Sequence, residues 1–168
     1  MFSGRQGPYT EDDVPDPVDL YGRSKLLGEV SGPGALTLRT SMVGRELRHH
    51  RGLIDWFVGE RGRTVKGYAR TLYTGLTTSA LADLVGDILQ FHAALEGVWQ
   101  VSSDPITKFD LLQIVNQAYG LGIEIERDEQ FLCDRRLDST RFRRQVGTSP
   151  SMWAFPGGSN LPPARQKR

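Results

Sequence analysis

Short apolar runs rich in strand-forming residues alternate along this chain with longer segments whose apolar residues recur at helical spacing. The strand-like runs cover residues 35–41, 64–73 and 97–103. The clearest helical spacing is that of Leu81, Leu84, Val85, Ile88 and Leu89. Because strands that alternate with helices usually build a parallel sheet, this order predicts an α/β fold with a largely parallel sheet.

The first helix is expected after the loop of residues 2–15, which is rich in Gly, Pro and acidic residues. Asp16 is the expected N-cap, and Pro17 suits the first helical position. Asp19 adds favourable charge in the first turn, and the turn at residues 31–34 ends the helix. The predicted apolar stripe of this helix comprises Leu20, Leu27 and Val30.

Two later helices carry start and stop signals. Thr107 and Asp110 are spaced as in a capping box, and Gly120 is the expected end of the helix that follows. Asp138 is expected to cap a last short helix, which Gly147 ends. These signals place two helices after the last of the three strand-like runs.

The composition limits the class of protein. With 168 residues, of which 38% are hydrophobic and 24% charged, the chain is expected to be one soluble globular domain or a piece of a larger one. A formal net charge of +1 gives no general attraction for nucleic acid or membranes, and no apolar run approaches a membrane span. The single cysteine, Cys133, indicates a reducing cytosol, and the three histidines lack partners at metal-ligand spacing, so no metal site is predicted.

Tyr21 and Lys25 lie four residues apart on the first predicted helix, so their side chains share one helical face. A phenol alone is a poor acid at neutral pH, with a pKa of about 10, and a nearby ammonium favours the phenolate. Gly28, one turn further on, leaves room for a ligand. Such a pair is suited to protonating a carbonyl oxygen. A packed tyrosine beside a solvated lysine is the alternative interpretation.

Several motifs surround this pair. They are Phe2-Ser3-Gly4, residues 7–13, residues 15–17 and residues 21–29. Together they resemble the extended short-chain dehydrogenases/reductases of the dTDP-4-dehydrorhamnose reductase type. Residues 38–41 resemble the family's strand after the catalytic helix, and residues 136–139 resemble its segment near the nucleotide-sugar site. The resemblance extends from Phe2 to about Pro150.

This resemblance implies a Rossmann-type parallel sheet with a small α/β substrate-binding part. It implies NAD(P)H-dependent reduction of a 4-keto nucleotide sugar in polysaccharide biosynthesis. Tyr21 would be the general acid that protonates the ketone oxygen, and Lys25 would assist it and hold the nicotinamide ribose. Thr40 and Ser41 would border the nicotinamide of a bound NADP or NAD. Arg136 would pair with substrate diphosphate oxygens, with a solvated arginine beside a helix cap as the alternative.

The resemblance also implies a cytoplasmic protein with a nucleotide-sugar substrate and with neither nucleic acid nor membrane as a partner. Homodimerisation stays open for a full-length enzyme. The chain departs from the family in lacking the glycine-rich loop that cradles the cofactor pyrophosphate and the catalytic Ser or Thr upstream of Phe2. We therefore expect the C-terminal portion of such an enzyme, inactive alone, weak in cofactor binding and marginally folded.

The same resemblance predicts three parts. Residues 1–45 would be the end of the Rossmann domain, including the helix with Tyr21 and Lys25. Residues 46–150 would interleave the last Rossmann elements with the substrate-binding domain. Residues 151–168, which contain Pro156, the pair Pro162-Pro163 and a basic end, would be a disordered or frameshifted tail.

Two alternative functions stay open. One is a nucleotide-sugar epimerase or dehydratase of the same fold. The other is a non-catalytic regulatory or binding protein, because the regulatory subunit of methionine adenosyltransferase is similar to the same family. Residues 72–78 depart from the proline-containing stretch expected of rhamnose reductases, which leaves the particular sugar open.

Overall fold

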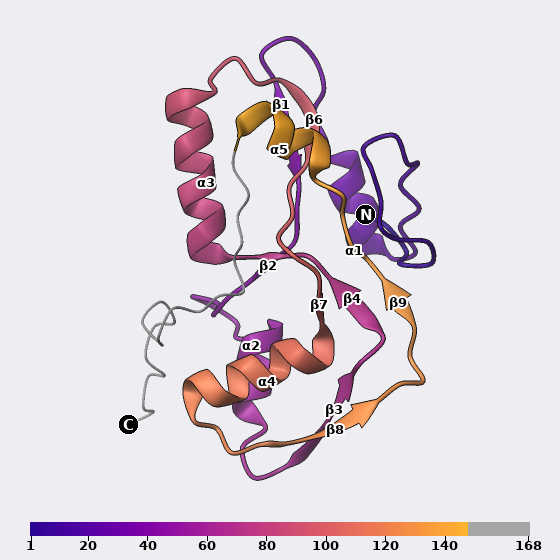
Figure 1. Ribbon diagram of the computed structural model, residues 1–168, viewed down its shortest axis with the longest axis vertical. Coiled ribbons are helices and arrows are strands. Elements are labelled where there is room, and N and C mark those ends of the chain that lie inside the picture. The colour runs from indigo at the N-terminus through magenta and orange to yellow at the C-terminus, as the bar shows by residue number, and fades with distance from the viewer. Residues whose placement is uncertain (148–168) are drawn as a thin grey trace.

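The computed structural model describes residues 1–147, which form helices and short strands in alternation (Figure 1). The helices are α1 (Leu20–Leu27), α2 (Leu53–Gly59), α3 (Thr78–Phe91), α4 (Lys108–Tyr119) and α5 (Thr140–Val146). The strands are β1 (Leu36–Arg39), β2 (Met42–Val43), β3 (Thr64–Tyr68), β4 (Thr71–Tyr73), β5 (Leu76–Thr77), β6 (Gly97–Gln100), β7 (Ile106–Thr107), β8 (Glu124–Asp128) and β9 (Cys133–Asp134). This order confirms the predicted α/β fold class. The expectation for residues 151–168 lies outside the described residues.

Most strand pairings within residues 1–147 are parallel. β1 pairs with β6, β2 with β5, and β3 with β8, each in parallel. β4 lies between an antiparallel β7 and a parallel β9. The parallel character is confirmed, and the pairings form separate sheets of two or three strands rather than one continuous sheet.

Two hydrophobic cores hold these small sheets. In the lower half of Figure 1, α2 and α4 lie beside β3 and β8. Their core comprises Val43, Ile54, Phe57, Val65, Ile106, Leu111, Leu112, Val115, Leu121 and Ile123. In the upper half, α3 and α5 lie beside β1 and β6. The second core comprises Leu76, Leu84, Ile88, Trp99, Val101, Phe142 and Val146.

The helix signals of α4 are confirmed. The Thr107 hydroxyl accepts a hydrogen bond from the Asp110 amide at 3.0 Å and donates one to the Asp110 carboxylate at 2.6 Å. Gly120 ends the helix with φ 57° and ψ 44°, the left-handed conformation that glycine adopts most easily. This cap, in which the Asp110 carboxylate bonds to the Thr107 hydroxyl rather than to its amide, depends only on neighbouring residues, which explains why the sequence predicts it.

The last helix differs slightly from its prediction. Gly147 ends α5 with φ 74°, as expected. The N-cap position belongs to Ser139, whose side chain makes no capping bond. The predicted cap, Asp138, instead lies one residue earlier and accepts a hydrogen bond from the Thr140 amide at 2.8 Å. The carboxylate therefore still serves one of the free amides of the first turn.

The prediction for the start of α1 is wrong by three residues. The N-cap is Asp19, whose carboxylate accepts a hydrogen bond from the Gly22 amide at 2.6 Å. Asp16 instead accepts from both the amide and the hydroxyl of Ser3, at 2.7 and 2.5 Å. The Asp16 carboxylate, which the sequence predicts as the helix cap, thus binds Ser3 of the N-terminal loop instead.

Two further expectations are corrected. The predicted apolar stripe of α1 is not buried in the described part of the chain, since Leu20, Leu27 and Val30 are exposed. The predicted strand at residues 64–73 is two strands separated by a turn at residues 69–70. The turn is needed because β3 pairs with β8, whereas β4 pairs with β7 and β9.

Candidate functional site

Tyr21 and Lys25 project from the same face of α1. The Nζ atom of Lys25 lies 5.3 Å from the centroid of the Tyr21 ring. Tyr21 is 72% exposed, and Lys25 is also exposed. The structure therefore brings the predicted pair together and leaves both polar groups accessible. An exposed phenol next to an ammonium is a group that can transfer a proton to a ligand.

The start of α1 is built around a close contact. Gly22 is the buried residue of this helix, and a Cβ added there would lie 2.8 Å from the Cβ of Pro17. A side chain at this position would push the helix away from the loop that precedes it. The glycine between Tyr21 and Arg23 therefore lets α1 lie close to Pro17.

Thr40 and Ser41 follow directly after β1, at its carboxyl end, where α/β sheets place their ligands. Both residues are partly buried. The Ser41 carbonyl accepts a hydrogen bond from the Leu76 amide at 2.8 Å, while the Thr40 hydroxyl donates to the Ser41 carbonyl at 3.3 Å. Their backbone is thus fixed at the position predicted to border a nicotinamide.

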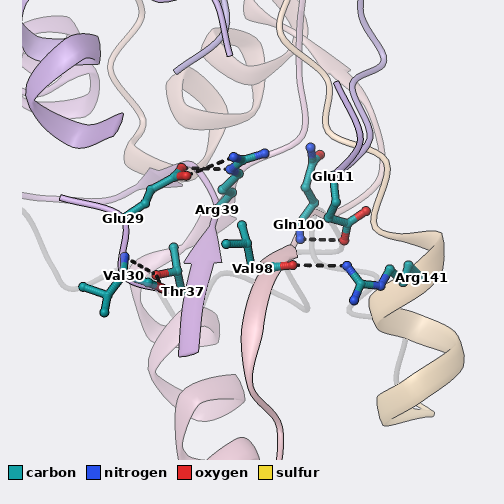
Figure 2. A network of polar contacts seen from close by, with 8 residues as sticks. All are labelled: Glu11, Glu29, Val30, Thr37, Arg39, Val98, Gln100 and Arg141. Carbon is teal, nitrogen blue, oxygen red and sulfur yellow. Dashed lines mark hydrogen bonds and ion pairs between the residues drawn. The ribbon is translucent and has the colours of Figure 1, made fainter. Parts of the chain in front are cut away.

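An ion pair joins the end of α1 to the end of β1. The Arg39 Nε and Nη2 atoms donate to the two carboxylate oxygens of Glu29, at 2.8 and 2.9 Å (Figure 2). Their side chains are only 9% and 13% exposed, respectively. Sequence reasoning missed both residues. The available signal was an arginine at the end of an apolar strand, which needs a charged partner once it is buried.

A second set of contacts joins the two ends of the loop between α1 and β1. The Thr37 hydroxyl accepts from the Val30 amide at 3.0 Å and donates to the Val30 carbonyl at 2.8 Å (Figure 2). The loop of residues 30–36 is therefore held at both of its ends. As a result, α1 and β1 are linked by side-chain contacts as well as by the chain.

The outer edge of β6 is covered by side chains from two other segments. The Gln100 amide donates to the Glu11 carboxylate at 2.9 Å, and Arg141 donates to the Val98 carbonyl at 3.3 Å (Figure 2). These contacts occupy backbone groups that a further strand would otherwise use. They fix the strand next to β1.

Arg136 lies two residues after the end of β9, where its carbonyl accepts a hydrogen bond from the Tyr9 amide at 2.8 Å. Its guanidinium is held by Asp134, with Nη2 to Oδ2 at 2.6 Å and Nε to Oδ1 at 2.9 Å. Burial opposes ionisation of Asp134, but the hydrogen bonds and charge of Arg136 outweigh it and lower the pKa of this carboxyl. A diphosphate at Arg136 would therefore compete with Asp134.

Residues 1–147 contain no cluster of side chains arranged to hold a metal ion. In the same residues, none of the helices has both the length and the apolar character needed to cross a membrane.

Comparison with known proteins confirms the resemblance to sugar-nucleotide reductases. A hypothetical dTDP-4-dehydrorhamnose reductase from Sulfolobus tokodaii superposes with a TM-score of 0.69 and 26% identity, over 85% of this chain and 54% of that one. The Bacillus anthracis dTDP-4-dehydrorhamnose reductase in complex with NADP gives a TM-score of 0.65 at 16% identity, over 86% and 55% of the two chains. The second likeness establishes the fold alone. This chain thus has the fold of dTDP-4-dehydrorhamnose reductases.

A further relative is named as a subunit of methionine adenosyltransferase and not as a reductase. The methionine adenosyltransferase 2 subunit beta of Danio rerio is 25% identical over 92% of this chain and 58% of its own length. No family model matches the chain. The chain spans little more than half the length of these relatives.

Proposed function

We propose that this chain carries the proton-donating part of an NAD(P)H-dependent reductase of a 4-keto nucleotide sugar. The observation that carries the proposal is the accessible Tyr21–Lys25 pair, located on a chain with the fold of dTDP-4-dehydrorhamnose reductases. A reduced nicotinamide would supply the hydride to the carbonyl carbon. The Tyr21 hydroxyl would donate its proton to the ketone oxygen, which becomes the alcohol of the product.

Each other residue of the proposed site has a role that its placement allows. The Lys25 ammonium would stabilise the phenolate left on Tyr21 and hold the ribose of NADP or NAD. Thr40 and Ser41 would border the nicotinamide from the end of β1. Arg136 would release Asp134 and bind the substrate diphosphate in its place. Residues 1–45 would then be the end of the Rossmann domain of a cytoplasmic enzyme of polysaccharide biosynthesis, and residues 46–150 would interleave the last Rossmann elements with its substrate-binding domain.

A chimera tests this function directly. Residues 1–147 would replace the corresponding half of the Sulfolobus tokodaii protein, whose fold they share. We expect the chimera to oxidise NADPH in the presence of a dTDP-4-keto sugar, as followed by the loss of nicotinamide absorbance. The unfused chain is the control and is expected to show no turnover. A folded chimera that binds NADPH but reduces no keto sugar would contradict the proposal.

A regulatory role is the second candidate, and the methionine adenosyltransferase subunit among the relatives favours it. In that case the chain would bind a catalytic methionine adenosyltransferase subunit, and Tyr21 would take part in no turnover. Size-exclusion chromatography of the chain with a purified catalytic subunit tests this role. Co-elution together with an inactive chimera would favour regulation, whereas separate elution with an active chimera would favour reduction.

A further inference from the structure

We infer that Glu29 and Arg39 are positioning residues, which hold α1 at a fixed angle to the carboxyl end of β1 and so set where Tyr21 and Lys25 point. The inference rests on the function proposed for α1. Its test uses measurements on the chain itself, so that failure of the positioning role can be told apart from failure of the proposed reaction.

Apolar packing holds α1 only weakly in the described part of the chain. Among its eight residues, the buried one is Gly22, which has no side chain. Leu20, Tyr21 and Leu27 are between 72% and 87% exposed. A helix that buries so little apolar surface depends for its orientation on polar contacts at its ends.

Two polar contacts link the end of α1 to β1, the Thr37–Val30 hydrogen bonds and the Glu29–Arg39 ion pair, and the ion pair is the one formed between two charged side chains. The Asp19 cap bonds within the helix itself and links it to no other element. Glu29 lies one residue beyond the C-cap Gly28 and four residues after Lys25, and it contacts β1. Two parallel hydrogen bonds between a guanidinium and a carboxylate constrain orientation as well as distance, which a lysine in place of Arg39 cannot do.

Arg39 also lies where the two parts of the proposed site meet. It directly precedes Thr40 and Ser41, the residues proposed to border the nicotinamide. Its Cζ atom lies 5.7 Å from the centroid of the Phe2 ring, so the guanidinium is held from the N-terminal loop as well. A change at Arg39 would therefore alter the position of Lys25 relative to Thr40, although Arg39 itself need not touch a ligand.

The variants Arg39→Lys and Glu29→Gln test this role in the complete chain. Hydrogen exchange is followed by mass spectrometry in peptides from α1, α3 and α4. The contact between Val30 and Thr37, which joins the segment after α1 to β1, is followed by nuclear Overhauser effects. Arg141→Lys is the matched control, because it changes an arginine that contacts the other strand of the same pair.

We expect both variants to speed exchange in α1 by about tenfold or more, with α3 and α4 unchanged, and to weaken the Val30–Thr37 contact signal. The control should leave α1 as in the wild type. Equal loss of protection in all three helices would overturn the inference, because the ion pair would then only stabilise the fold. Unchanged α1 exchange in Glu29→Gln would also overturn it, even if Arg39→Lys fails to fold. A loosened α1 in a chain whose chimera reduces no ketone would support positioning and reject the proposed reaction.

Discussion

The ammonium of Lys25 lies over the ring of Tyr21, with 5.3 Å between Nζ and the ring centroid, on the exposed side of α1. A cation over an exposed aromatic ring contributes roughly 0.5–1 kcal/mol. This contact uses the face of the ring and not its hydroxyl. Removing the hydroxyl therefore tests proton donation while leaving the association of the two side chains in place.

Tyr21→Phe in the chimera is expected to lower the rate of NADPH-dependent ketone reduction by about 10²-fold or more, the usual contribution of a positioned general acid. Because Tyr21 is largely exposed, the free energy of unfolding should change by less than about 0.5 kcal/mol. Steady-state kinetics and urea unfolding measure the two quantities. Tyr68→Phe on β3 is the control, and undiminished turnover in Tyr21→Phe would reject the assigned role.

Asp55→Asn is expected to remove part of the pH dependence of stability. Burial opposes ionisation of Asp55, but hydrogen bonds from the Glu46 amide, Arg45 and His50 outweigh it and lower the pKa. Since the folded pKa is below the unfolded value of about 3.9, this stability is fully present above pH ~4 and lost as the pH falls through the folded pKa.

Urea unfolding at neutral and acidic pH checks this prediction. At pH 7, Asp55→Asn should cost about 1–3 kcal/mol, because it replaces a buried carboxylate that accepts several hydrogen bonds. The difference from the wild type should shrink as the pH falls below about 4, because the carboxyl of the unfolded chain then takes up a proton more readily than the folded Asp55 does. Asp12→Asn, at an exposed position, should have little effect. A cost for Asp55→Asn that is the same at both pH values would contradict the prediction.

Leu112→Ala is expected to destabilise the chain by about 2–5 kcal/mol, because it removes buried methyl groups and leaves a cavity in the core between α4 and α2. Leu112 is fully buried, whereas Leu47 is 99% exposed. Leu47→Ala should therefore change the free energy of unfolding by less than about 0.5 kcal/mol. Equal effects in urea unfolding would show that this core does not form in solution.

Two glycine substitutions are expected to have opposite signs. Gly120 has φ 57° at the end of α4, so Gly120→Ala forces a left-handed conformation on alanine and should cost about 1–2 kcal/mol. Gly86 lies inside α3, where an added Cβ meets open space, so Gly86→Ala should stabilise by roughly 0.5–1 kcal/mol. Thermal unfolding by circular dichroism measures both. A stabilising effect of Gly120→Ala would indicate that α4 does not end at Gly120.

The elements predicted correctly are those whose signals lie within a few neighbouring residues. The Thr107 N-cap with Asp110 and the Gly120 stop involve residues at most one turn away, so spacing along the chain is enough to specify them. The start of α1 was predicted wrongly because Asp16 and Asp19 are equally good caps locally. A contact with Ser3, thirteen residues earlier, decides between them.

The candidate site likewise has features that the sequence predicts and features that it does not. The sequence alone determined that Tyr21 and Lys25 share a helical face, because helix geometry places residues four apart on one side. Only the tertiary structure decided that Glu29 binds Arg39, that Arg136 is held by Asp134, and that the apolar stripe of α1 is exposed. Charged and apolar side chains have many acceptable partners in a sequence, and the path of the chain between segments selects the one that each meets.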